Sequence, residues 1–377
     1  MKNSILLLFV VCLFISCSEE YKLKYPETKK VDVTDNYHGT IVADPYRWLE
    51  DNTSEETAKW VETQNKVTEE YLSTISFRND IKERLTELWN YERYSMPEKV
   101  GKYYFFYKND GLQEQSVVYK QEGLQGEAKV FIDPNKFSDD GSISLTGIYF
   151  SNDNKYCGYG ISRGGSDWQE YYILDVETGE KLNDEILWVK FSGMSWYKDG
   201  FFYSRYDEPK SEDKLKAENE YHKVYYHKIG TPQSEDELIY EDKSNPKRNF
   251  YAGVTEDEKY LILYISDVSS TYNMLYYKSL ETNEPIKPFI NNFEANYSVV
   301  DNIDGKFLVL TDFETPNYKL VLIDPNNPAK EKWETIIPES ENTISSVSFI
   351  GEKLFISYLK DATTKISVFD IKGQYKY

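Results

Sequence analysis

Cysteine and histidine are scarce in this sequence, which has three residues of each among 377. Two of the cysteines, Cys12 and Cys17, lie in the first 17 residues, so Cys157 is the only thiol beyond them. A disulfide framework inside the folded part is therefore excluded. No group of cysteine, histidine and carboxylate residues has metal-ligand spacing, and no glycine-rich phosphate motif precedes a helix. The sequence thus predicts no metal site and no cofactor.

Positive charge is also in short supply. The chain has 44 lysines and arginines against 64 aspartates and glutamates, which gives a net charge of −20. Because binding to a phosphate backbone requires a basic surface, nucleic acid is excluded as a partner. Alanine and methionine are few, whereas tyrosine (34), phenylalanine (19) and tryptophan (7) are abundant. This usage favours a mainly β protein.

Residues 1–17 have the pattern of a targeting segment. Lys2 supplies the positive start, and the apolar run from Ile5 to Ile15 is too short to span a bilayer as a stable helix. The run ends at Cys17 in a pattern that resembles a bacterial lipoprotein signal with lipidation at that cysteine, and Ser18-Glu-Glu20 resembles the acidic tag of some surface lipoproteins of Bacteroidetes-type bacteria. An ordinary secretory signal is the alternative. We expect a periplasmic or cell-surface protein whose only membrane contact is a lipid anchor in the bacterial outer membrane.

Two amphipathic helices are predicted before residue 91. Thr53-Ser-Glu-Glu56 matches a capping box, in which the Thr53 hydroxyl and the Glu56 carboxylate bond free amides at a helix start. This helix is expected to run to about Ile75, and a second to run from Phe77 to Asn90. Each has one apolar face, so each needs something to pack on.

From residue 99 onward, short strands replace the helical pattern. In the clearest unit, strands over 144–150, 156–161 and 170–176 are separated by turns, and a weaker fourth strand follows. Turn centres then recur at intervals of 45, 58, 47 and 46 residues, at Lys155, Gly200, Glu258, Gly305 and Gly351. A repeat of about 40–50 residues with four short strands is typical of a β-propeller. We predict six such units, the first over 101–133 and the last ending after its third strand.

One short motif could be mistaken for a catalytic site. Gly160-Ile-Ser-Arg-Gly164 matches the G-x-S-x-G nucleophile elbow, in which a strand-to-helix turn exposes the serine. Here a strand rather than a helix follows the motif, and His38, His222 and His227 have no evident orienting carboxylate. We therefore interpret Ser162 as part of a blade loop and predict no catalytic residue in this chain.

Several longer phrases carry a family resemblance. They are Tyr37-His-Gly39, Asp44-Pro-Tyr-Arg-Trp-Leu-Glu-Asp51, Gly111-Leu-Gln-Glu-Gln115, Gly165-Ser-Asp-Trp168, Val189-Lys-Phe-Ser192, His222-Lys-Val-Tyr-Tyr-His227 and Gly230-Thr-Pro-Gln-Ser-Glu-Asp236. Within a match that covers roughly residues 22–371 in order, they resemble prolyl oligopeptidases. The resemblance implies a seven-bladed propeller that caps an α/β-hydrolase domain, and cleavage after proline by a Ser-Asp-His triad.

The resemblance also implies how the chain is divided. After the lipoprotein signal expected over 1–17, it implies an extended and helical segment over 18–90 that belongs to the peptidase domain in the family, and an incomplete propeller over 91–377. About six of the seven blades would be present. The α/β-hydrolase domain, with all three triad residues, would lie beyond Tyr377 and would therefore be missing from this chain.

A few propeller residues can be assigned by the same resemblance. Phe191 matches a phenylalanine that lines the substrate cavity in the family, the alternative being a core aromatic between blades. Asp167 matches an aspartate at the domain interface, where it would pair with an arginine of the missing domain. The charged insertion over 207–221 matches a mobile loop that gates peptide entry. Asn249 and Ser269 stand where relatives line the cavity with an apolar or thiol residue.

The sequence therefore predicts the propeller portion of a serine endopeptidase that acts on short proline-containing peptides. The propeller would gate access of these peptides, and the chain alone is expected to be inactive and monomeric. The alternative is a non-enzymatic surface propeller that binds peptides or glycans. Incomplete blades and unpartnered helices argue against that alternative, because open strand edges promote aggregation.

Overall fold

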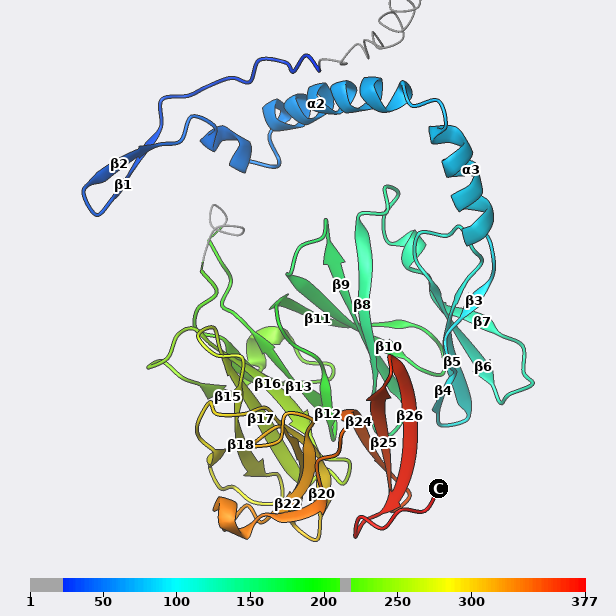
Figure 1. The fold of residues 1–377 in the computed structure, drawn as a ribbon, viewed down its shortest axis with the longest axis vertical. Helices are drawn as coiled ribbons and strands as arrows, with labels where there is room; N and C mark the ends of the chain where they lie inside the picture. Colours follow the sequence, from blue (N-terminus) through cyan, green and yellow to red (C-terminus); the bar gives the residue numbers. More distant parts are fainter. Residues whose placement is uncertain (1–22, 211–217) are drawn as a thin grey trace, which may run out of the picture. The chain divides into compact units, whose positions relative to one another are not determined.

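The computed structural model describes residues 23–210 and 218–377 (Figure 1). The predicted signal segment with Cys17, and the middle of the charged insertion at 211–217, lie outside the described residues. The chain divides into two compact units, one ending at Tyr91 and one running from Glu92 to Tyr377. The division lies one residue beyond the predicted boundary, and the assignment of the first part to a peptidase domain stays a prediction.

The first unit contains a hairpin, a short 3-10 helix and the two expected α-helices. Their bounds are Thr34–Tyr37 (β1), Thr40–Ala43 (β2), Arg47–Glu50 (η1), Glu55–Ser73 (α2) and Arg78–Trp89 (α3). No residue of α3 is buried, and Ile81, Leu85 and Leu88 are each about half exposed. That these apolar faces pack on a further domain stays a prediction. Within residues 23–210 and 218–377, no helix is long and apolar enough to cross a membrane.

The start of α2 differs by one residue from the predicted capping box. Ser54 is the N-cap, and its hydroxyl accepts a hydrogen bond of 3.1 Å from the Thr57 N–H. The Thr53 hydroxyl instead donates to Asp51 Oδ1 at 2.8 Å, and the Glu56 carboxylate pairs with Lys29 at 2.8 Å. The prediction that Thr53 and Glu56 form the box was therefore wrong, because a turn around Asp51 already engages the threonine.

The second unit is built from successive antiparallel sheets, the blades of a propeller (Figure 1). Blade 1 contains β3 (Arg93–Tyr94), β4 (Glu98–Val100), β5 (Tyr103–Asn109), β6 (Val117–Glu122) and β7 (Lys129–Ile132), and blade 2 contains β8 (Ile143–Phe150), β9 (Tyr156–Arg163), β10 (Gln169–Asp175) and β11 (Lys181–Val189). Blade 3 contains β12 (Ser195–Tyr197), β13 (Gly200–Arg205), β14 (Lys223–Lys228) and β15 (Glu237–Glu241), and blade 4 contains β16 (Arg248–Val254), β17 (Tyr260–Asp267), β18 (Asn273–Ser279) and β19 (Lys287–Ile290). Blade 5 contains β20 (Tyr297–Ile303), β21 (Lys306–Thr311), β22 (Lys319–Ile323) and β23 (Glu334–Ile337), and blade 6 contains β24 (Thr343–Ile350), β25 (Lys353–Lys360) and β26 (Thr363–Asp370). Among the described residues of this unit, 3-10 helices lie between strands at Pro134–Lys136 (η2), Gln233–Glu235 (η4) and Lys330–Lys332 (η5).

The mainly β propeller fold and its repeat are confirmed. Each predicted turn centre lies in or beside the link between the first and second strands of a blade. These tight links need left-handed backbone, which Asn154, Glu258 and Asp304 supply at φ between 51° and 62°. The first strands of blades 2, 4, 5 and 6, which are β8, β16, β20 and β24, are edge strands paired on one side.

Hydrophobic side chains fill the spaces between successive blades. Alternation along each strand sends neighbouring side chains to opposite faces of the sheet. On β13, Phe201 and Tyr203 pack with residues of blade 2, whereas Phe202 packs with residues of blade 4. Cys157 is fully buried between blades 1 and 2, and burial raises the pKa of its thiol to about 12, so this thiol is inert at neutral pH.

Blades 2 and 3 are joined into one eight-stranded sheet, which the regular repeat did not predict. The connection is a single antiparallel pair between Val189 of β11 and Arg205 of β13. It forms where β12, only three residues long, leaves the far end of β13 without its usual partner. The segment between β11 and β12 begins directly after this pair and contains Phe191.

Blade 6 has three named strands, as predicted, and the residues after them continue the pairing. The chain turns at Gly373 and returns along β26. Lys376 N–H donates to Val368 O and Val368 N–H donates to Tyr377 O, each at 2.8 Å. The last residues thus occupy the place of a fourth strand.

Candidate functional site

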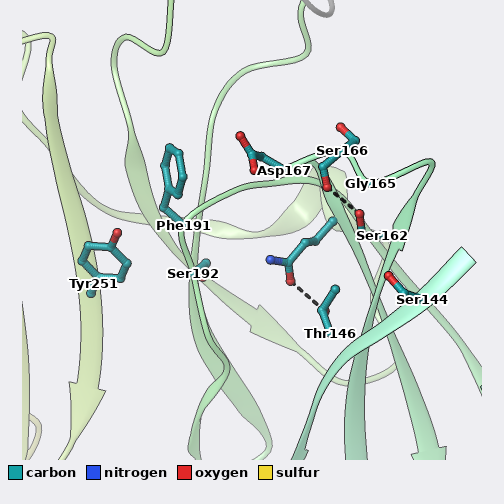
Figure 2. A pocket seen from close by; sticks show the side chains of 10 residues that line it. Ser144, Thr146, Ser162, Gly165, Ser166, Asp167, Phe191, Ser192 and Tyr251 are labelled. Atoms are coloured by element: carbon teal, nitrogen blue, oxygen red, sulfur yellow. Dashed lines mark hydrogen bonds between the residues drawn. The ribbon is translucent and has the colours of Figure 1, made fainter. Parts of the chain in front are cut away.

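A cavity of about 500 Å³ lies beside blade 2, the segment after β11 and the edge strand β16 (Figure 2). Its lining residues are Ser144, Thr146, Ser162, Gly165, Ser166, Asp167, Gln169, Phe191, Ser192 and Tyr251. Hydroxyl groups predominate, two aromatic rings provide apolar surface, and Asp167 supplies negative charge. This composition suits an uncharged, partly apolar ligand with hydrogen-bonding groups.

Phe191 is held in an unusual backbone conformation at the cavity wall. Its φ of +52° is left-handed, which is strained for a bulky residue and is characteristic of functional sites. Its ring is 36% exposed, and Figure 2 shows it on the same side of the cavity as Tyr251, which is 37% exposed. Phe191 therefore lines this cavity, and its contact with a substrate stays a prediction.

Asp167 projects from the loop between β9 and β10, and its side chain is 71% exposed. Lys190 lies beside it, with 3.7 Å between Lys190 Nζ and Asp167 Oδ2. The lysine side chain is only 11% exposed and also donates to Asn219 Oδ1 at 3.1 Å. Asp167 thus has a cation within the propeller and remains open to a second one, so its pairing with an arginine of another domain stays a prediction.

Ser162 is a structural residue of blade 2. It lies near the end of β9, is 6% exposed, and donates through Oγ to Ser166 O at 2.5 Å. A side chain at Gly160 would collide with Thr146 and Tyr171, and Gly164 has a left-handed φ of +60° in the tight turn. The blade therefore accounts for both glycines of the G-x-S-x-G pattern, and a strand follows it as expected.

His222 is fully buried immediately before β14 and connects two parts of the cavity wall. Phe250 N–H donates to Nδ1 at 3.0 Å, and Nε2 bonds Lys190 O at 2.9 Å. Because Lys190 O can only accept, Nε2 carries the proton and the ring is neutral. Burial lowers the pKa of His222 to about 4, against a weaker opposing effect of the bond to Lys190.

His227, at the other end of β14, is equally buried but lies between two carboxylates. Nδ1 is 2.7 Å from Asp236 Oδ1, and Nε2 is 3.0 Å from Asp184 Oδ1. Burial by itself lowers the pKa of His227, but the hydrogen bonds to Asp184 and Asp236 outweigh it and raise the pKa to about 9. Neither carboxylate was evident from the sequence: Asp184 lies on β11 of blade 2, and Asp236 follows η4, nine residues after the histidine.

Two further expected cavity residues are engaged elsewhere. Asn249 Oδ1 accepts a hydrogen bond of 2.5 Å from the Tyr206 hydroxyl, and the Ser269 hydroxyl donates to Asp267 Oδ1 at 2.6 Å. Neither lines the cavity, whereas Tyr251, two residues after Asn249 on β16, does. Asn249 and Tyr251 lie on the same face of β16, so the sequence pattern alone does not distinguish them.

A second cavity, of about 700 Å³, adjoins the first at Tyr251 and lies along the first strands of blades 4, 5 and 6. Its lining is uncharged and includes the side chains of Tyr251, Tyr264, Ser266, Asn273, Asn296, Tyr297, Ser298, Leu310, Tyr318, Thr343, Ile344 and Ser345. Within residues 23–210 and 218–377, no three or more histidine, cysteine or acidic side chains are grouped so that they could hold a metal ion.

Comparison with known proteins identifies the architecture. The family model of the prolyl oligopeptidase N-terminal beta-propeller domain matches residues 25–376. The chain belongs to the prolyl oligopeptidase family. Prolyl endopeptidases from Elizabethkingia miricola and Elizabethkingia meningoseptica are 45% and 44% identical to it over 362 and 361 residues. The match covers 96% of this chain and 51% of each of these relatives.

Solved structures of this family agree with that result. A variant of prolyl oligopeptidase B from Galerina marginata bound to a macrocyclization substrate is 27% identical, with a TM-score of 0.81 over 94% of this chain and 54% of that chain. The chain thus spans about half the length of the prolyl oligopeptidases it matches. It corresponds to their propeller, and the catalytic domain is not in this chain.

Proposed function

We propose that this chain is the propeller portion of a serine endopeptidase that hydrolyses short proline-containing peptides, and that the propeller limits access to the active site. The observation that supports the proposal most is the match of residues 25–376 to the propeller model of this family. The cavity beside Phe191 is consistent with a role of the propeller in binding peptide. The relatives named above are prolyl endopeptidases and a prolyl oligopeptidase, which supports the same class of substrate.

In this proposal the propeller contributes binding and selection, and a second domain contributes the chemistry. The rings of Phe191 and Tyr251 would hold an apolar side chain of the peptide, because an aromatic face offers apolar surface at low entropic cost. The surrounding hydroxyl groups would bond its backbone. The second, uncharged cavity would give an extended peptide a route along the first strands of blades 4 to 6.

The direct experiment begins with the gene. We expect the reading frame to continue beyond codon 377 for about 300 codons, and to encode a G-x-S-x-G placed between a strand and a helix, then an aspartate and a histidine. The full-length protein should cleave a blocked Gly-Pro chromogenic amide after proline and should be inactivated by a serine-directed phosphonate. The 377-residue chain should be inactive. A stop codon at this point, or a full-length protein without proline-specific cleavage, would favour a binding propeller instead.

We further propose a monomer, anchored by a lipid at Cys17 in the outer membrane and facing the periplasm or the cell surface. The support is the sequence of residues 1–20, which lie outside the described structure. Labelling cells with a radioactive fatty acid should mark the wild-type protein and not the Cys17→Ala variant. Equal labelling of the two, or label on neither, would leave only the secretory alternative. Analytical ultracentrifugation of the soluble protein should give the mass of one chain.

A further inference from the structure

We infer that His222 is a positioning residue for the cavity, because it fixes the backbone beside both aromatic rings, Phe191 and Tyr251. Its Nε2–H donates to the carbonyl of Lys190, the residue before Phe191. Its Nδ1 accepts from the N–H of Phe250, the residue before Tyr251. One rigid ring thus sets the spacing of two chain segments that belong to different blades.

The requirement for this connection comes from the strand that carries Tyr251. β16 is the edge strand of blade 4, so alternate backbone groups along it have no ladder partner. Both groups of Phe250 are bonded from blade 3 or its approach, its N–H by His222 and its carbonyl by the Ser204 hydroxyl at 2.7 Å. Buried backbone groups are costly to leave unpaired, so these two side chains determine where β16 lies.

The Lys190–Phe191 segment needs support for a different reason. Phe191 has a left-handed backbone, and such a conformation persists only where the surroundings impose it. The bond from His222 to Lys190 O is one such restraint. The imidazole also packs beside the ring of Tyr206, with 4.5 Å between the ring centroids.

The two bonds of His222 can be separated with a matched pair of variants. The amide nitrogen of glutamine reaches about as far as Nε2, so His222→Gln can keep the bond to Lys190 and lose the one to Phe250. The amide oxygen of asparagine reaches about as far as Nδ1, so His222→Asn can keep the bond to Phe250 and lose the one to Lys190. Ser204→Ala is the control, because it removes the other bond to Phe250 and leaves Lys190 untouched.

The kinetic readout rests on the proposed peptidase function and uses the full-length protein. For an oligopeptide substrate, His222→Asn should raise KM about fivefold with kcat nearly unchanged, since a hydrogen bond of ordinary strength that positions bound substrate is lost. His222→Gln keeps the bond to Lys190 and should raise KM by only about twofold, and Ser204→Ala, which also loses one bond to Phe250, should raise it by the same amount. Equal increases in KM for all three variants would reduce His222 to a stabilising residue and overturn the inference.

A structural readout separates this inference from the proposed function. Crystal structures of the two variants should show Phe191 displaced in His222→Asn and Tyr251 displaced in His222→Gln, relative to the wild type. If the protein proves to have no peptidase activity, the proposed function fails, and these displacements still decide the role of His222. Unmoved rings in both variants would overturn it whatever the kinetics. If one variant does not fold, the other still tests its own half of the connection.

Discussion

The two ends of β14 carry fully buried histidines with opposite protonation states. His222, at the end nearer Phe191, is neutral and bonds two backbone groups. His227, at the other end, is an imidazolium held between Asp184 and Asp236. The residues are five positions apart, an odd spacing, and their rings lie on opposite faces of the sheet: His222 stacks on Phe250 of blade 4, and His227 bonds Asp184 of blade 2.

The comparison shows that the bonding partners, rather than burial, set the charge of a buried histidine. Burial lowers the pKa of both rings. Backbone partners cannot reverse that effect at His222, whereas two carboxylates do so at His227. The neutral ring of His222 can therefore hold backbone groups beside the cavity. The charged ring of His227 joins β11 to β14, and we call His227 with Asp184 and Asp236 the charged clamp.

The largest expected effect comes from removing the charged ring. His227→Leu leaves Asp184 and Asp236 buried and facing an apolar group, and it should lower the free energy of unfolding by about 3–5 kcal/mol. Urea denaturation of the full-length protein, followed by tryptophan fluorescence, measures this. Adding Asp184→Asn and Asp236→Asn to the same variant should restore part of the loss. A loss below about 1 kcal/mol would show that the clamp is not what holds blades 2 and 3 together.

The pH dependence of stability should separate the two rings by sign. His227 has its pKa raised from 6.5 to about 9, so the stability it contributes is complete below pH 6.5 and is lost as the pH rises through 9. His222 has its pKa lowered from 6.5 to about 4, so its contribution is complete above pH 6.5 and is lost as the pH falls through 4. Each is worth at most about 3 kcal/mol.

Leucine variants test these signs through the difference from wild type at each pH. His227→Leu should remove the loss of stability on the alkaline side, and it should also change the acidic side because Asp184 loses the partner that lowers its pKa. His222→Leu should flatten the acidic slope alone. If the free energy of unfolding depends on pH in the same way in the wild type and both variants, the two histidine rings do not differ in charge. The contrast between His222 and His227 would then be wrong.

A smaller loss is expected when the neutral ring is removed. His222→Leu leaves the Phe250 N–H and the Lys190 carbonyl buried without their partner, which should cost about 2 kcal/mol of unfolding free energy at pH 7. The melting temperature and the urea midpoint measure it. If His222→Leu lowers the free energy of unfolding as much as His227→Leu does, the charged hydrogen bonds of His227 stabilise the protein no more than the neutral ones of His222.

The regular parts of this molecule could be predicted from sequence, because they depend on local patterns. The spacing of turns such as that at Glu258 gave the blades, since a tight link between two apolar strands needs a residue that tolerates left-handed backbone. The union of blades 2 and 3 through Val189 and Arg205 could not be predicted, because it depends on how short β12 is in three dimensions. The cap of α2 was misplaced because a turn at Asp51 competed for Thr53.

The site was less predictable than the fold. Phe191 came from a family phrase, whereas Tyr251 was missed because it lies on the same face of β16 as the expected Asn249. A signal for the histidines was present: two of only three in the chain lie at an odd spacing around one apolar strand. What the sequence did not give is their partners, since Lys190, Asp184 and Phe250 lie on strands or segments far from β14 along the chain.

The substitution with the smallest expected change in free energy is at Phe191, and it tests most directly whether the two ends of β14 have different functions. Phe191→Ala should raise KM for an apolar proline-containing peptide about fivefold, the value of one aromatic contact of about 1 kcal/mol, because the ring faces the cavity. Its effect on the urea midpoint should be slight, since the side chain is partly exposed already. Leu238→Ala, on β15 and 44% exposed, removes a similar apolar surface away from the cavity and should leave KM unchanged. If Phe191→Ala lowers stability and leaves KM unchanged, the ring is a packing residue, and the end of β14 at His222 supports the fold in the same way as the end at His227.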